Sequence, residues 1–148
     1  MKMTYPTIGL ALVLAAPFPA AASSPIPMVM YKNPSCTCCE AYAAYLEESG
    51  LFKVELRPSN DVGQIAAERG VPTELQGCHT IEVGDYIIEG FVPLNVVKKM
   101  LVELPPIAGV GVPGMPVGAP GMPGTKTEPW TIYAFTKDGK APTVYAVE

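Results

Sequence analysis

The sequence predicts an α/β domain in which helices pack on a mixed β-sheet. Short apolar runs of strand length alternate with segments of helical apolar spacing, and glycine or proline marks the joins. The chain has 148 residues, of which 49% are hydrophobic and 16% charged, and this composition excludes a disordered polyelectrolyte. Its formal net charge is −4 without a basic run, which argues against binding to nucleic acid.

The N-terminal segment has the order of a secretory signal peptide. Lys2 precedes an apolar run at residues 8–16, prolines follow, and Ala20-Ala21-Ala22 offers the small residues that a signal peptidase requires. The run is shorter than the roughly 20 residues of a membrane span, so an uncleaved anchor is the less favoured alternative. We expect residues 1–22 to be removed. Residues 23–148 would then form one domain without a membrane span, in the periplasm or outside the cell.

The first predicted unit is a strand, a helix and a second strand. Residues 29–32 form an apolar run that ends at Asn33-Pro34. Thr37 and Glu40 have the spacing of a capping box, with Thr37 as the N-cap of a helix that Gly50 closes. A second strand is predicted at residues 52–56. Strand, helix and strand within about 30 residues make a βαβ unit, whose strands should be parallel and whose crossover should be right-handed.

The middle of the chain predicts a second helix, two strands and a third helix. Asn60 or Asp61 can cap a short helix that ends near Arg69. Residues 80–83 and 86–89 are expected to form strands around a turn, and a last helix follows Pro93. This order of elements, βαβ, α and ββα, is typical of a thioredoxin-like domain.

The composition changes in the last third of the chain. Residues 105–129 are about half glycine and proline, so we expect neither a helix nor a central strand there. A Pro-Gly-Met-Pro sequence occurs at 113–116 and again at 120–123, and the apolar side chains around it favour an ordered loop on the domain over a flexible linker. Residues 130–136 and 143–147 then predict a C-terminal hairpin that extends the sheet or covers its edge.

Three of the four cysteines lie where the first strand leads into the first helix. Cys36 would precede this helix, and Cys38 and Cys39 would lie in its first turn. Free backbone N–H groups and the helix dipole favour thiolate over thiol at such a position. Cys78 precedes the third strand, and in a thioredoxin-like topology its loop passes near the start of the first helix. The four sulfurs can therefore gather from two segments.

Three interpretations of the cysteines remain open. A crowded, uneven set of thiolates suits Cu(I) better than Zn(II), which prefers four ligands at tetrahedral corners. We favour this copper interpretation. The first alternative is a thiol–disulfide oxidoreductase that uses Cys36 and Cys39. The second is a secreted binding module held by two disulfides, with no chemistry of its own.

Three further residues are secondary candidates for a metal site. His79 either makes a structural hydrogen bond or orients and supplements the sulfur site, since it adjoins Cys78. Met115 and Met122 occupy the same position in the two Pro-Gly-Met-Pro sequences and could supply soft thioether ligands. The favoured alternative is that both methionines fill apolar gaps beneath the loop.

Four motifs together resemble a known family. They are Cys36-Thr-Cys-Cys39, Cys78-His-Thr80, Glu89-Gly-Phe-Val-Pro93 and the doubled Pro-Gly-Met-Pro sequence. They are similar to a family long catalogued only as a domain of unknown function (number 411), one member of which is the periplasmic copper-resistance protein CopG. The resemblance runs from about residue 28 to residue 147. It implies a thioredoxin-like fold whose cysteines have lost ordinary disulfide exchange and bind a copper cluster, with Cys36, Cys38, Cys39 and Cys78 as ligands.

One position departs from the family pattern. The family commonly has histidine where this chain has Phe91, so a redox step that depends on that histidine would be missing here. We therefore expect a periplasmic Cu(I)-binding protein that contributes to copper homeostasis or resistance, and not an enzyme, although a copper redox activity stays open. The expected partners are copper ions, singly or as a multinuclear cluster, and other periplasmic copper-handling proteins.

Overall fold

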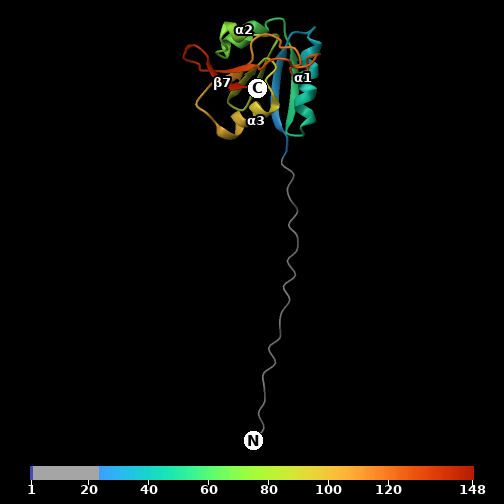
Figure 1. Ribbon diagram of the computed structural model, residues 1–148, viewed down its shortest axis with the longest axis vertical. Coiled ribbons are helices and arrows are strands. Elements are labelled where there is room, and N and C mark those ends of the chain that lie inside the picture. Colours follow the sequence, from blue (N-terminus) through green and yellow to red (C-terminus); the bar gives the residue numbers. More distant parts are fainter. Residues whose placement is uncertain (2–23) are drawn as a thin grey trace.

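The structure is a computed structural model that describes residue 1 and residues 24–148 (Figure 1). The predicted signal peptide at residues 1–22 lies, Met1 apart, outside the described residues. In the described part of the chain, none of the helices has the length and apolar character needed to cross a membrane.

Seven strands form one mixed sheet in the order β2-β1-β3-β4-β5-β6-β7. Strands β1 and β2 are parallel, as are β4 and β5, and the other neighbouring pairs are antiparallel. The mixed sheet predicted from the sequence is confirmed. The strands are β1 (Ile26–Lys32), β2 (Phe52–Pro58), β3 (His79–Val83), β4 (Tyr86–Glu89), β5 (Gly109–Gly111), β6 (Thr131–Phe135) and β7 (Thr143–Val147).

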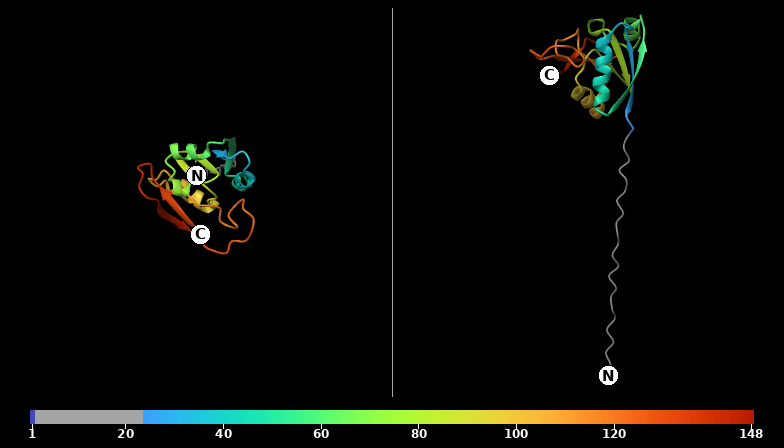
Figure 2. Two further views of the ribbon diagram at one scale, coloured as in Figure 1. Left: turned by 90° about the horizontal axis from the view of Figure 1, so that it is seen from above. Right: turned by 90° about the vertical axis from the view of Figure 1, so that its right-hand side faces the viewer.

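Three α-helices flank the sheet, as predicted: α1 (Thr37–Glu48), α2 (Val62–Glu68) and α3 (Leu94–Glu103). A short 3-10 helix, η1 (Thr73–Leu75), precedes β3. Helices α1 and α3 contribute to the larger apolar cluster, whereas α2 belongs to a separate, smaller cluster. Helices α2 and α3 accordingly lie on opposite sides of the strands (Figure 2).

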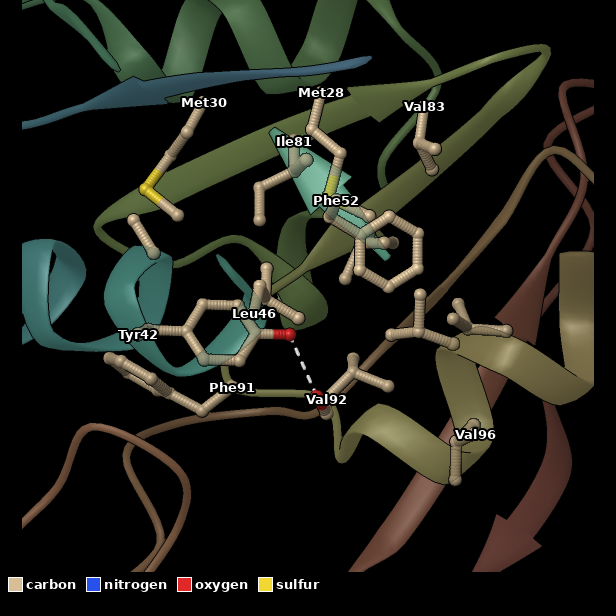
Figure 3. Close-up of a cluster of buried hydrophobic side chains, with 14 of the residues drawn as sticks. Met28, Met30, Tyr42, Leu46, Phe52, Ile81, Val83, Phe91, Val92 and Val96 are labelled. Carbon is tan, nitrogen blue, oxygen red and sulfur yellow. Dashed lines mark hydrogen bonds between the residues drawn. The ribbon is translucent and has the colours of Figure 1, made fainter. Parts of the chain in front are cut away.

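The larger core joins α1 to the sheet and to the segment before α3 (Figure 3). Met28 and Met30 of β1 face this core and are almost completely buried. Tyr42 of α1 is also buried, and its hydroxyl donates a hydrogen bond of 2.7 Å to the carbonyl oxygen of Val92. This bond satisfies a polar group that burial would otherwise penalise, and it fixes α1 against the Glu89–Pro93 motif.

The pairing of β1 with β3 decides where the cysteines meet. Lys32 at the end of β1 is paired with His79 at the start of β3 in an antiparallel register. The chain therefore leaves β1 toward Cys36 at the same edge of the sheet at which it arrives from Cys78. The backbone N–H of Asn33 also donates to the carbonyl oxygen of Cys78 at 3.0 Å, which holds the two connections side by side.

The prediction that residues 105–129 hold no central strand is wrong. Strand β5 lies between β4 and β6 inside the sheet, although it has only three residues. Two of them are glycines, and glycine fits here because a Cβ at Gly109 would collide with the carbonyl oxygen of Ile87 and would lie 2.7 Å from Cζ of Phe135. The neighbouring strands approach β5 closely, so glycines stand where the β-branched side chains typical of a strand would not fit.

The rest of this region is an ordered loop on the domain, as predicted, and the hairpin of β6 and β7 extends the sheet. We call residues 116–124 the strap. Two turns close it, with the N–H of Ala119 donating to Pro116 and the N–H of Met122 donating to Ala119. Ala119 is buried in the larger core. At Gly121, whose φ is +81°, the backbone lies so close to α1 that an added Cβ would be 2.9 Å from the carbonyl oxygen of Cys38.

Candidate metal centre

The first helix begins with a sulfur as its cap. Cys36 is the N-cap residue of α1, and its Sγ accepts a hydrogen bond from the backbone N–H of Cys39 at 3.2 Å. The predicted capping box, with Thr37 as the cap, is wrong, because Thr37 is already the first helical residue. A sulfur that receives a backbone N–H at a helix start is stabilised as a thiolate.

All four cysteine sulfurs gather at this point. Their Sγ atoms lie within 4.8 Å of one another, and they come from two segments. Cys78 Sγ is 3.2 Å from Cys36 Sγ and 3.2 Å from Cys39 Sγ, and Cys38 Sγ is 3.3 Å from Cys36 Sγ. The gathering expected from the topology is therefore what the structure has.

A disulfide joins Cys36 to Cys39, and Cys38 and Cys78 are free. The pair is the one that the oxidoreductase alternative names. One disulfide with two thiols differs from the two disulfides of a stapled binding module. In this oxidised form two of the four sulfurs are engaged with each other, so reduction of one bond yields a set of four thiols.

Cys78 is held as a neutral thiol in this form. Partial burial, with Cys38 nearby, raises the pKa of Cys78 to about 11. A metal ion that binds here displaces the proton, since the thiolate is the ligand. The site therefore favours a soft metal ion, whose bond to the thiolate is strong enough to offset the loss of the proton.

His79 is buried directly behind Cys78. Its Nε2 lies 3.1 Å from the carbonyl oxygen of Gly90, which can only accept, so Nε2 carries the hydrogen and Nδ1 has a free lone pair. Nδ1 lies 3.8 Å from Cys78 Sγ. Burial lowers the pKa of His79 to about 4, so the ring is neutral at pH 7. The hydrogen bond to Gly90 is the structural one expected of this histidine, and an orienting role toward the sulfur site stays a prediction.

Phe91 fills the position at which the family resemblance implies a histidine. Its ring lies 4.9 Å from that of His79 and 5.5 Å from that of Tyr42, edge to face in both pairs. The three rings are buried together, and among them His79 lies next to Cys78. The Phe91 ring offers neither a metal ligand nor a proton carrier.

The two methionine candidates are placed differently. Met115 is 61% exposed, and nothing lies within 4 Å of a Cβ added at the neighbouring Gly114. Met122 belongs to the strap and packs against the larger core. The two Pro-Gly-Met-Pro sequences thus have different surroundings, and only the second rests on α1.

Two buried charged side chains near the cysteines escaped the sequence reasoning. Lys32 is 2% exposed, and its Nζ contacts the carbonyl oxygens of the β1–α1 connection. Glu89 is fully buried and accepts hydrogen bonds of 2.7 Å from the backbone N–H of Gly77 and from the hydroxyl of Thr80, on either side of Cys78. Desolvation raises the pKa of Glu89 to about 7. The position of Glu89 in the Glu89–Pro93 motif is the sequence feature that could have marked it as part of the site.

Comparisons with known proteins show which family the chain belongs to. A family model described as "Protein of unknown function, DUF411" matches residues 75–122, which include Cys78, Glu89 and the strap up to Met122. No curated protein sequence matches the chain. Two solved structures, titled "Copper resistance protein copG", Form 1 and Form 2, each match with a TM-score of 0.74 and 30% identity. Each match covers 84% of this chain and 98% of the other. The chain therefore belongs to the DUF411 family, together with the copper resistance protein CopG.

Proposed function

We propose that the chain is a periplasmic Cu(I)-binding protein that holds copper on the thiolates of Cys36, Cys38, Cys39 and Cys78 and contributes to copper resistance. The observation that carries the proposal is the gathering of four sulfurs from two segments within 4.8 Å. The copper-resistance relatives support the choice of metal. The N-terminal sequence pattern supports the periplasmic location.

The arrangement of the sulfurs favours copper over zinc. Three of the sulfurs come from one short segment, two of them from adjacent residues, and such a set cannot easily occupy the corners of one small tetrahedron. Cu(I) accepts soft thiolates in uneven sets. The neutral His79 beside Cys78 adds no charge to the site, and its Nδ1 can accept the S–H hydrogen of Cys78 until a metal ion displaces that proton.

Copper binding would require the reduced protein. In the oxidised form, the Cys36–Cys39 disulfide removes two of the four thiolates. Reduction frees them without a large movement, because the bonded sulfurs already lie 3.2 Å from Cys78 Sγ.

Anaerobic titration with Cu(I) tests the proposal. The reduced protein should bind copper with a defined stoichiometry, whereas the oxidised protein and Cys78→Ser should bind less. Met115→Leu is the matched control, since it removes an exposed sulfur and should leave the stoichiometry unchanged. No copper binding by the reduced protein, or equal binding by Cys78→Ser, would refute it.

A thiol–disulfide oxidoreductase is the second candidate, favoured by the disulfide at the start of α1. Catalysed reduction of insulin by the wild-type protein, lost in Cys36→Ser, would support this activity. The free Cys38 and Cys78 argue against it, because thiols this close to the disulfide trap mixed disulfides.

A further inference from the structure

Lys32 is a buried cation at the entrance to the cysteine segment. It ends β1 and is 2% exposed, although lysine is rarely buried without partners. Its Nζ lies 3.1 Å, 3.2 Å and 3.4 Å from the carbonyl oxygens of Asn33, Pro34 and Cys36, in that order. The β1–α1 connection is therefore wrapped around one ammonium group.

The acidic side chain that pairs with Lys32 is exposed to solvent. Glu40, in the first turn of α1, lies 3.0 Å from Lys32 Nζ and is 55% exposed. Solvent screens the charge of an exposed carboxylate more strongly than that of a buried ammonium. The field of Lys32 Nζ is thus screened less than that of Glu40, and Nζ lies 3.4 Å from the carbonyl oxygen of Cys36, the residue whose sulfur caps the helix.

This field acts differently on the two states of the Cys36–Cys39 pair. The disulfide carries no charge, whereas the reduced pair carries thiolate charge that is stabilised by a nearby cation and by the helix start. A reduced form stabilised in this way makes the disulfide easier to reduce.

We propose that Lys32 is a positioning residue of the metal centre, which shapes the β1–α1 connection and favours the reduced, metal-ready thiols over the disulfide. The proposal rests on the proposed function only in taking the reduced form as the working form. Lys32 Nζ binds the carbonyl oxygen of Asn33, the residue whose backbone N–H donates to the carbonyl oxygen of Cys78 in the second segment.

The test is the equilibrium with glutathione, which needs no copper. Two glutathione thiols reduce the Cys36–Cys39 disulfide, so that one S–S bond breaks in the protein, one forms in oxidised glutathione, and two electrons pass to the protein. The two protons from glutathione go to the protein sulfurs, or to solvent for each sulfur that stays a thiolate. Lys32→Met should shift this equilibrium toward the disulfide by about three- to tenfold. Glu40→Gln should shift it by a smaller factor in the opposite direction.

Lys53→Met is the matched control. It removes the same charge from a side chain that is 74% exposed and paired with Glu47 in the last turn of α1, so the equilibrium should not change. Lys32→Met with an unchanged equilibrium would overturn the proposal, as would Glu40→Gln shifting toward the disulfide. If Lys32→Met does not fold, the sign of the Glu40→Gln shift decides. Failure of the wild-type protein to bind Cu(I) would refute the proposed function and leave this result standing.

Discussion

Cys78 Sγ lies 3.2 Å from Cys39 Sγ, although 39 residues separate them in the sequence. The antiparallel register of β1 and β3 produces this contact, because it sets Lys32 opposite His79 and so aligns the residues that flank both cysteine segments. Cys78 immediately precedes β3 and Cys39 lies in the first turn of α1, so the contact follows from how the two connections meet the paired strands. The candidate metal centre is thus a product of strand pairing.

Gly121→Ala should uncover the first turn of α1. A Cβ at this position would lie 2.7 Å from the backbone nitrogen of Tyr42 and 2.9 Å from the carbonyl oxygen of Cys38, so the strap must move away. We expect faster alkylation of Cys38 by iodoacetamide, measured by mass spectrometry on the oxidised protein.

Gly114→Ala is the control for this change. Gly114 has a similar φ of +73°, so its replacement carries the same backbone strain, but nothing lies within 4 Å of the added Cβ. Alkylation of Cys38 should stay at the wild-type rate. Equal rates in the two variants would show that the strap does not cover this turn.

Glu89→Gln should change how stability depends on pH. The pKa of Glu89 is raised to about 7 in the folded protein from an ordinary value of 4.5, so its ionisation in the unfolded chain destabilises the fold as pH rises between these values. The pKa of His79 is lowered to about 4 from 6.5, so its titration makes the folded protein more stable as pH rises between these values. This effect opposes that of Glu89 and hides it in the wild-type protein.

The difference between the two proteins isolates Glu89. The free energy of unfolding of Glu89→Gln minus that of the wild type should rise from about pH 4.5 to about pH 7 and then stay level. Urea unfolding at a series of pH values measures it. A difference that is flat across this range would mean that Glu89 ionises normally in the folded protein.

Gly109→Ala should destabilise the protein by about 2 kcal/mol. The added Cβ meets the carbonyl oxygen of Ile87 and the ring of Phe135, and neither can withdraw without disturbing the pairing of β5 with its neighbours. Thermal or urea unfolding provides the measurement.

Gly63→Ala gives the opposite sign for the same chemical change. Gly63 lies within α2, and the nearest atom to an added Cβ is Oε1 of Gln76 at 3.7 Å, an ordinary contact. Alanine should stabilise this helix by up to about 1 kcal/mol. If Gly109→Ala also left stability unchanged or raised it, the tight packing of β5 would be contradicted.

Much of the fold could be predicted because its signals are local. The apolar runs before Asn33-Pro34 and before Pro58 identify β1 and β2, and the turn at Gly84 identifies the β3–β4 hairpin, which the structure confirms. Strand β5 could not be predicted in this way. Its three residues include Gly109 and Gly111, which lack the side chains on which strand recognition depends.

The gathering of the four sulfurs could be predicted from the sequence, whereas the buried charged residues around them could not. Cysteine spacing and topology indicate that Cys78 meets the Cys36–Cys39 segment. Lys32 and Glu89 resemble solvent-exposed strand ends in the sequence, because burial of a charge depends on contacts that only the folded chain provides. The cap at Cys36 was missed because sulfur is not among the usual capping groups. The thioredoxin-like relationship and the four-cysteine ligand set stay predictions.

Copper K-edge X-ray absorption on the reduced, Cu(I)-loaded protein tests the central claim most directly. The account predicts that sulfur alone surrounds copper in the wild-type protein, and that Cys78→Ser lowers the number of sulfur neighbours. A first shell dominated by nitrogen or oxygen, or a spectrum that Cys78→Ser leaves unchanged, would contradict it.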